Sequence, residues 1–137
     1  MRCLRRKLAA VAVAGMLGAT ALGTPGATAG EETEEAWGAC ARGHVCFYTG
    51  ANGTGAKCAW SVADPDWTQG AQRCSWSQSR NVKSVWNRGT ATNFSGVAYY
   101  QWRNYSTRKG CTRQDRRGNL AGTYMLKSHQ WVKGACG

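Results

Sequence analysis

Apolar and polar side chains alternate in short runs along the chain, and each run is closed by residues that favour turns. The clearest run is Val45–Tyr48, which is followed at positions 49–55 by a stretch of Gly, Asn and Thr. A period of two is typical of a β-strand, and the glycine-rich stretch after it predicts a hairpin. Residues 57–62 alternate in the same way, so we expect them to form the returning strand. Nothing in this first half of the predicted domain carries apolar residues at helical spacing over a useful length, and the pattern therefore predicts an all-β fold.

The rest of the chain continues this pattern of short strands separated by turns. Residues 63–73 contain Asp-Pro-Asp and Gln-Gly, which predict a surface loop. Residues 103–110 are mostly polar and are expected to form a hairpin. The further predicted strands and apolar core positions are residues 82–86, 94–100, 120–126 and 131–132.

Two of the predicted strands share one frame of residues. Val45 and Tyr48 in the first match Val97 and Tyr100 in the second, and the two tyrosines lie 52 positions apart. Such a repeat predicts two copies of one β unit. Many short strands with abundant Gly predict a sandwich or barrel, and most of the seven Trp residues are expected to fill its core.

The first residues have the features of an export signal. Four basic residues precede an apolar stretch at positions 8–22, and Ala27-Thr28-Ala29 offers the small-x-small pattern of a cleavage site. We therefore expect residues 1–29 to be a signal peptide, residues 30–37 an acidic flexible tail and residues 38–137 the folded domain. An uncleaved anchor is the alternative for the first segment. No second apolar stretch of membrane-spanning length follows, so the protein is predicted to be secreted, without a membrane span.

Cysteine use fits an exported domain. Six cysteines follow the predicted signal, and an even number in a small secreted domain is typical of disulfides rather than of a metal site. Six cysteines allow 15 pairings, among which the sequence does not choose. We take nearest neighbours as the working prediction, which pairs Cys40–Cys46, Cys58–Cys74 and Cys111–Cys136.

The predicted domain is strongly basic. From residue 36 onward there are fourteen Lys and Arg against Asp64, Asp66 and Asp115. Such a surface favours acidic partners, namely an acidic protein face, an anionic cell-wall polymer or an anionic membrane. Export argues against a nucleic-acid partner. A basic surface that only keeps the protein soluble is the alternative.

The chain has few residues that could act as catalytic acids, bases or nucleophiles. The histidines are His44 and His129, and beyond the tail there are only three acids. A set of Ser128, His129 and Asp115 is unfavourable, because adjacent residues of a strand point to opposite faces. We therefore predict no enzyme, no metal and no cofactor.

The stretch around the first two cysteines resembles a known family. It follows the pattern Cys-x-x-Gly-x-Val/Leu-Cys-x-Tyr-Ser/Thr-Gly, and Ser84 and Asn87 match a later Ser-x-x-Asn strand. Both motifs are similar to those of secreted bacterial metalloproteinase inhibitors of peptidase inhibitor family 36. The resemblance implies a βγ-crystallin-like sandwich of two Greek-key units. The matching positions of the first motif are Cys40, Gly43, Val45, Cys46, Tyr48, Thr49, Gly50 and Gly55.

The resemblance also implies a function and a site. Family members inhibit a zinc endopeptidase with an exposed, substrate-like loop of the second unit. Here that loop corresponds to Cys111, Thr112 and Arg113, flanked by Arg108 and Lys109. In the best-known members a short disulfide ring closes the loop, and the exposed bond follows its first cysteine. This chain has no second cysteine in the next several residues, and Thr112 replaces a larger aliphatic residue.

Two further points follow from the same resemblance. Some crystallin-like domains bind calcium through a run of Asn, Asp and Ser, but Arg80 and Val85 replace oxygen ligands here, so no calcium is expected. A basic, antimicrobial or killer-toxin-like protein, or a cell-surface binder on the same scaffold, is the alternative to an inhibitor. A purely structural exported domain is the third alternative. We expect a monomer in each case.

Overall fold

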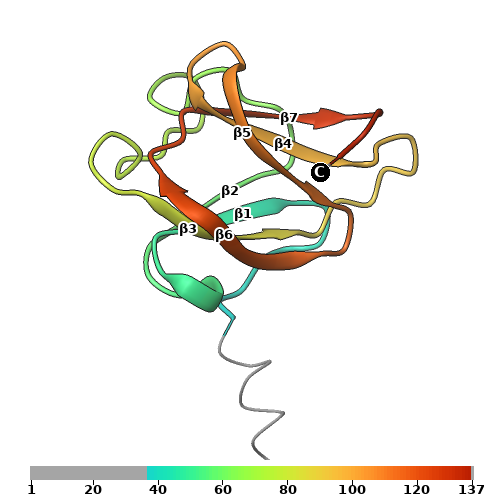
Figure 1. The fold of residues 1–137 in the computed structure, drawn as a ribbon, viewed down its shortest axis with the longest axis horizontal. Helices are drawn as coiled ribbons and strands as arrows, with labels where there is room; N and C mark the ends of the chain where they lie inside the picture. The colour runs from blue at the N-terminus through green and yellow to red at the C-terminus, as the bar shows by residue number, and fades with distance from the viewer. Residues whose placement is uncertain (1–36, 137) are drawn as a thin grey trace, which may run out of the picture. The chain divides into compact units, whose positions relative to one another are not determined.

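The computed structural model describes residues 37–136, which form two antiparallel β-sheets. The predicted signal peptide and all but the last residue of the predicted tail lie outside the described residues. Figure 1 shows the two sheets as stacked layers. One sheet has the strand order β2-β1-β3-β6 and the other β5-β4-β7. The elements are β1 Val45–Tyr48, the 3-10 turn η2 Ala51–Gly53, β2 Lys57–Trp60, β3 Val82–Asn87, β4 Gly96–Trp102, β5 Ser106–Arg113, β6 Arg117–Tyr124 and β7 Ser128–Val132.

The fold consists of two Greek-key units, and each unit contributes a segment to the sheet of the other. β6 follows β5 in sequence but pairs with β3 of the first sheet. In the first half, the segment after β2 crosses over, and Asp64 forms an isolated antiparallel bridge with His129 of β7. One segment of each unit thus pairs with the sheet of the other unit. These segments are β6 of the second unit and the residues around Asp64 of the first. This arrangement confirms the predicted all-β sandwich of two matching units.

The repeated frame of residues places matching side chains in one core. β1 and β4 are the strands that carry the shared frame, and Val45 and Val97 are both fully buried. Phe47 and Tyr99 occupy the same position in the two copies, and their rings meet edge to face at 5.8 Å between centroids. Because side chains alternate between the two faces of a strand, these residues all point inward. Each copy therefore contributes side chains to the contact between the two layers.

Aromatic residues fill much of this core, as the composition predicts. Trp60 and Trp67 stack at 4.5 Å and are 2% and 0% exposed. Trp67 lies in the segment that was predicted as a surface loop, and that prediction is wrong at this residue. Its indole enters the core because its Nε1–H finds an acceptor there, 2.9 Å away, in Nδ1 of His129. Trp76 and Trp131 are partly buried against this core, whereas Trp37 and Trp86 pack in a second cluster. Among the residues described, Trp102 is the exposed tryptophan, with 52% of its surface exposed.

Three disulfides close the fold, and they join nearest neighbours in sequence. Their Cα–Cα distances are 5.9, 5.8 and 5.1 Å in chain order. Because the described domain is small, such cross-links add stability that its core alone would supply only thinly. Within residues 37–136, no helix is long and apolar enough to cross a membrane. The pairs are Cys40–Cys46, Cys58–Cys74 and Cys111–Cys136.

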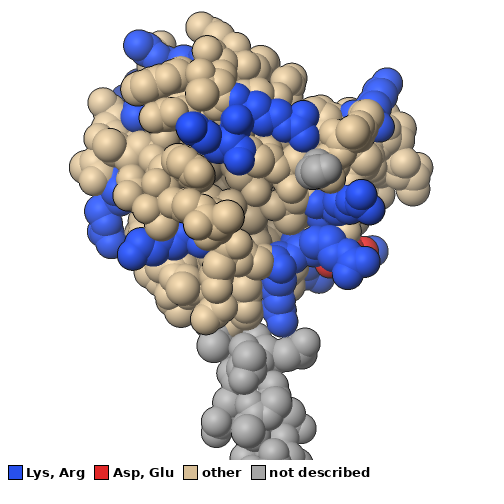
Figure 2. All heavy atoms as spheres, in the orientation of Figure 1, with Lys and Arg blue, Asp and Glu red and all other residues tan. Residues whose placement is uncertain are grey.

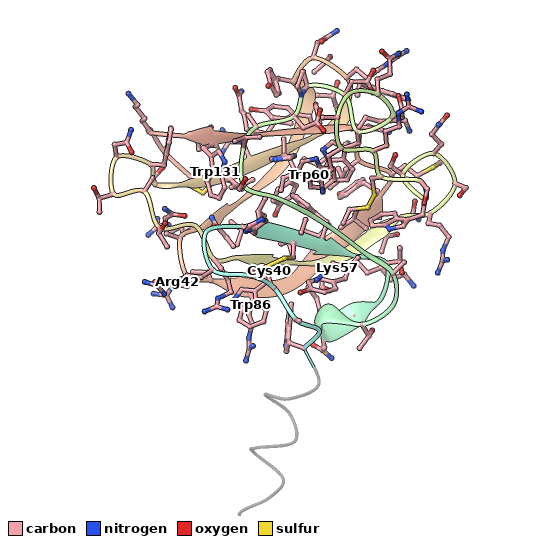
Figure 3. All side chains as sticks on the ribbon, turned by 180° about the vertical axis from the view of Figure 1, so that it is seen from behind. Cys40, Arg42, Lys57, Trp60, Trp86 and Trp131 are labelled. Atoms are coloured by element: carbon pink, nitrogen blue, oxygen red, sulfur yellow. A yellow bond between two sulfur atoms is a disulfide. The ribbon has the colours of Figure 1, made fainter. Side chains whose placement is uncertain are left out.

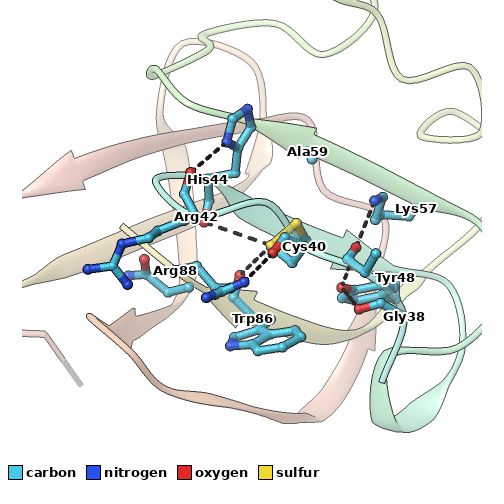
Figure 4. Close-up of a disulfide and its surroundings, with 12 residues drawn as sticks. Gly38, Cys40, Arg42, His44, Tyr48, Lys57, Ala59, Trp86 and Arg88 are labelled. Atoms are coloured by element: carbon cyan, nitrogen blue, oxygen red, sulfur yellow. Dashed lines mark hydrogen bonds between the residues drawn. A yellow bond between two sulfur atoms is a disulfide. The ribbon is translucent and has the colours of Figure 1, made fainter. Parts of the chain in front are cut away.

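The first disulfide fastens the N-terminal segment onto the outer face of the first sheet (Figure 4). Arg88 donates from a terminal guanidinium nitrogen to the carbonyl oxygen of Cys40 at 2.8 Å. The Tyr48 hydroxyl donates to the carbonyl oxygen of Gly38 at 3.0 Å, and Lys57 Nζ donates to that of Ala39 at 2.7 Å. The motif that carries the family resemblance therefore has a structural role, and we call this disulfide with its neighbouring hydrogen bonds the Cys40–Cys46 clasp.

Candidate functional site

The predicted inhibitory residues lie in a strand and not in an exposed loop, which corrects the sequence-based expectation. Cys111 and Thr112 belong to β5 and stand opposite Ala98 and Val97 of β4. The residues flanking them are polar, which suggested a loop, but an edge strand tolerates polar side chains because its pairing comes from the backbone. The turns of this region are shorter than predicted and fall at residues 103–105 and 114–116.

Thr112 is turned toward the protein. Its Oγ1 lies 3.1 Å from the hydroxyl of Tyr99, and burial raises the pKa of that tyrosine. Its carbonyl oxygen accepts a hydrogen bond of 2.8 Å from Nδ2 of Asn87, a fully buried residue of β3. The side chain and the carbonyl of Thr112 are thus both engaged within the fold.

A disulfide and two arginines fix β5 to the C-terminal segment. Cys111 is bonded to Cys136, across a sequence separation of 25 residues. Arg113 Nε donates to the carbonyl oxygen of Cys136 at 3.4 Å, and Arg108 donates to that of Ala135 at 3.3 Å. The segment passes closely over Gly96, where a Cβ would collide with Cys136 Sγ. β5 is therefore held from one side without the short disulfide ring that the resemblance implies.

The β4–β5 hairpin is an exposed loop of the second unit, and its backbone is strained. Asn104, Tyr105 and Thr107 have φ angles of 58°, 60° and 63°. Left-handed backbone is unfavourable for residues with bulky or β-branched side chains, so the surrounding structure must hold it. The backbone N–H of Asn104 donates to the carbonyl oxygen of Pro65 at 2.8 Å, and that of Tyr105 donates to Ser128 Oγ at 3.1 Å.

This hairpin presents an aromatic and a cationic side chain. Trp102 is 52% exposed, and the side chain of Arg103 is 59% exposed. They border a hollow of about 440 Å³, together with Lys127 and Ser106. Trp and Arg are the residues that most often carry the binding energy of protein interfaces. Sequence reasoning missed Trp102, because a tryptophan beside a strand predicts a core position.

Asp66 supports the same hairpin from the first unit. Its carboxylate lies 3.6 Å from Arg103, in the one salt bridge formed among residues 37–136. Partial desolvation acts to raise the pKa of Asp66, but hydrogen bonds from Thr68 and the charge of Arg103 outweigh it and lower this pKa. The carboxylate is ionised at neutral pH and attracts the guanidinium group, which limits the freedom of Arg103.

A second cluster of aromatic and cationic side chains covers the outer face of the first sheet, and Figure 3 shows one of its members, Trp86, on that face. The guanidinium carbon of Arg117 lies 5.0 Å from the ring of Trp37 and 4.9 Å from that of Trp86. Arg88 lies 5.3 Å from the ring of Trp86. Burial in this cluster raises the pKa of Tyr48 to about 12, although the charge of Arg117 acts to lower it. These contacts stabilise the sheet and keep cations at its surface.

Ser128 and His129, which were considered for catalysis, form hydrogen bonds within the fold instead. Ser128 Oγ donates to the carbonyl oxygen of Trp102 at 2.6 Å, and the ring of His129 bonds with Trp67 and Val62 in the core. Among residues 37–136, no three His, Cys, Asp or Glu side chains lie close enough to share a metal ion.

Comparison with known proteins gives one family. The model of "Peptidase inhibitor family I36" matches residues 33–112. The match spans more than half of the chain, from the acidic segment before Trp37 to Thr112 of β5. It includes the Cys40–Cys46 clasp and the exposed β4–β5 hairpin. No curated protein matches the chain.

Proposed function

Since the chain belongs to peptidase inhibitor family I36, we propose that it is a secreted inhibitor of an extracellular zinc endopeptidase. The observation that carries the proposal is the placement of β5. It is extended, lies at the edge of its sheet and is anchored by the Cys111–Cys136 disulfide. Proteins commonly recognise an extended segment by pairing it with a strand of their own, and an edge strand can be bound in this way.

The first half of β5 and the hairpin before it form the proposed contact surface. Arg108 is exposed, Lys109 is half-buried, and both follow the hairpin that bears Trp102. Cys111 and Thr112 are half-buried and Arg113 is exposed, and the Thr112 carbonyl is already bound by Asn87. We infer that the protease first contacts the hairpin and Arg108, and that the second half of β5 holds this surface rigid.

Rigidity is what the proposed mechanism needs. An inhibitor that is already ordered loses little entropy on binding, and a cleaved segment that is held in place can rejoin. The zinc ion in this mechanism belongs to the target enzyme, where it polarises a carbonyl group of the bound segment. The cations of β5 would increase the association rate with an acidic cleft rim more than the affinity.

The test is a titration of a thermolysin-type zinc protease with the disulfide-bonded protein. We expect stoichiometric inhibition, and little effect on a serine protease used for comparison. The variant Trp102→Ala is expected to raise the inhibition constant by about tenfold or more, the usual effect of losing an interface tryptophan. The control Val62→Ala removes an apolar side chain that is 65% exposed in the first unit, and it should leave inhibition unchanged.

The same titration separates the two halves of the contact. A loss confined to Thr112→Ala and Arg113→Gln would move the contact to the second half of β5. An absence of inhibition at several-fold molar excess over every zinc protease tried would contradict the proposal.

A second candidate function is binding to an anionic cell surface, and the charge of the domain favours it. Residues 36–137 carry fourteen cations and three acids. Binding of this kind weakens steeply as salt is added, because exposed charges are screened. Salt-sensitive wall binding or growth arrest without protease inhibition would favour this alternative.

A further inference from the structure

A groove of about 320 Å³ separates β5 from β6. These two strands are consecutive in sequence but belong to different sheets, so no backbone ladder joins them and the sandwich is open along this side. Both strands lie toward the viewer in Figure 1. Their side chains and those of the C-terminal segment line the groove, and Gly118 leaves it open, because a Cβ built there meets no atom within 4 Å.

Arginines surround the mouth of this groove. Arg113, Arg116 and Arg117 contribute to its lining, and none of the described residues that line it is acidic. The hydrogen bond from Arg113 to the Cys136 carbonyl uses Nε only. A guanidinium group presents its donors in a planar fork that matches two oxygens of a phosphate, sulfate or carboxylate.

Two hydroxyl groups lie deeper in the groove. Tyr99 and Thr112 both line it, and their oxygens are 3.1 Å apart. One hydroxyl hydrogen lies between the two oxygens, which leaves the other hydrogen for a ligand. The groove thus combines cations at its rim with a neutral donor at its base. This combination suits an anion with several oxygens.

The cationic character continues along the seam between the two strands. Lys109 of β5 lies 4.8 Å from the ring of Tyr124 of β6, at the other end of the seam from Arg113. Lys109 and Arg113 are four positions apart along the strand, which is about 13 Å. Figure 2 shows the face of Figure 1 with Lys and Arg spread over it and acidic atoms visible at one place. A row of cations of this length fits successive charged groups of a polymer better than a single ion.

We propose that the groove between β5 and β6 binds the tetrahedral oxyanions of an extracellular polyanion, with Arg113 and Arg116 as the main ligands. The oxyanion group is a phosphate or a sulfate, and Lys109 contacts the next charged group along the chain. Binding here fastens β5 to β6 and closes the open side of the sandwich. This site does not depend on the protein being a protease inhibitor, although it shares Lys109 and Arg113 with the strand considered above.

The experiment measures binding of linear polyphosphate to the disulfide-bonded protein by calorimetry, at two salt concentrations. The charge variant is Arg113→Gln with Arg116→Gln, and a second variant, Gly118→Val, fills the groove without changing the charge. The matched control is Arg73→Gln with Arg80→Gln, which removes two exposed arginines from the first unit. We expect both groove variants to weaken binding about tenfold or more and the control to change it less than threefold.

Binding of inorganic phosphate is followed in the unmodified protein by NMR, so the site is also tested without any variant. Shifts concentrated at Thr112, Gly118 and Asn119 are expected. Equal losses in the charge variant and its control, or full binding by Gly118→Val, would overturn the proposal in favour of unspecific attraction. Equally tight binding of a carboxylate polymer of the same charge would also overturn it. A sulfated polysaccharide is titrated in the same way as polyphosphate. The polymer that binds more tightly shows whether the site prefers phosphate or sulfate groups.

Discussion

The buried His129 is predicted to make the stability of the protein fall in mild acid. Its ring is 0% exposed and lies against Trp60 at 4.8 Å and Phe47 at 5.7 Å between centroids. The indole Nε1–H of Trp67 donates to Nδ1 at 2.9 Å, so this nitrogen carries no hydrogen. The other ring nitrogen, Nε2, therefore carries the hydrogen and donates to the carbonyl oxygen of Val62 at 2.9 Å. A second proton has to displace the bond from Trp67.

The magnitude follows from the pKa of His129. Burial lowers this pKa to about 4, although the hydrogen bond to the Val62 carbonyl acts to raise it. In the unfolded chain the value is about 6.5, so the unfolded state binds the additional proton first as the pH falls. The contribution of His129 to stability is complete above pH 6.5 and is lost progressively down to about pH 4. The loss in the free energy of unfolding is about 3 kcal/mol in full and about 2.5 kcal/mol at pH 4.5.

The assay is denaturant unfolding followed by tryptophan fluorescence at several pH values between 4.5 and 7.5, with the disulfides intact. Asp66 does not interfere in this window, because its pKa is lowered and its effect on stability falls at more acidic pH. We expect the midpoint to move to lower denaturant as the pH falls, with an unchanged slope.

The variant His129→Gln isolates the cause. Glutamine keeps one acceptor for Trp67 and one donor for Val62 but does not titrate in this range. It is expected to be less stable than the unmodified protein at pH 7.5, because the ring leaves a cavity, and to show a nearly flat pH dependence. A change of less than about 1 kcal/mol in the unmodified protein, or the same slope in the variant, would refute the reasoning.

Three further predictions concern the anchoring of β5. Asn87→Ala removes the donor to the Thr112 carbonyl and leaves a buried acceptor unpaired, so we expect a loss of about 1–3 kcal/mol in denaturant unfolding. Gly96→Ala places a methyl group against Cys136 Sγ, and we expect a loss of about 1–3 kcal/mol together with faster reduction of that disulfide by a mild thiol. Replacing both Cys111 and Cys136 with Ser opens a separation of 25 residues. It should lower stability by about 3 kcal/mol and increase hydrogen exchange of β5 amides; unchanged exchange would contradict the proposed anchoring.

Features that depend on neighbours in sequence were predictable. The alternation in Val45–Tyr48 and the glycines after it are visible as a strand and a turn, and the repeat at Val97 shows that the unit occurs twice. The sequence did not choose among the disulfide pairings, because the separation of two cysteines in a folded chain depends on topology. Only the spatial approach of β5 to the C-terminal segment brings Cys111 to Cys136.

Features that depend on distant contacts were missed. Trp67 and His129 are 62 residues apart and meet only because the segment after β2 crosses to the second sheet. The polar residues of β5 predicted a loop, yet backbone pairing with β4 makes them a strand. Tryptophan is a residue type that usually lies in the core, yet Trp102 lies at the surface, because the strand ends there and the strained hairpin begins. The positive φ of Tyr105 and Thr107 has no signal in their residue types, which both disfavour it.

The exchange of segments explains how so small a domain keeps a binding surface rigid. β6 of the second unit completes the first sheet, and an isolated bridge at Asp64 of the first unit adds to the second, so the two units are joined through both sheets. Each unit also fastens one terminal segment of the described residues across an outer face, with Cys40–Cys46 on the first sheet and Cys111–Cys136 on the second. The β4–β5 hairpin is in turn held through Pro65 and Ser128, which belong to different units. A strained hairpin persists only where contacts from several sides hold it, and within residues 37–136 this hairpin is the one place where a tryptophan is left exposed. The stability of the whole sandwich is therefore coupled to the shape of its proposed contact surface.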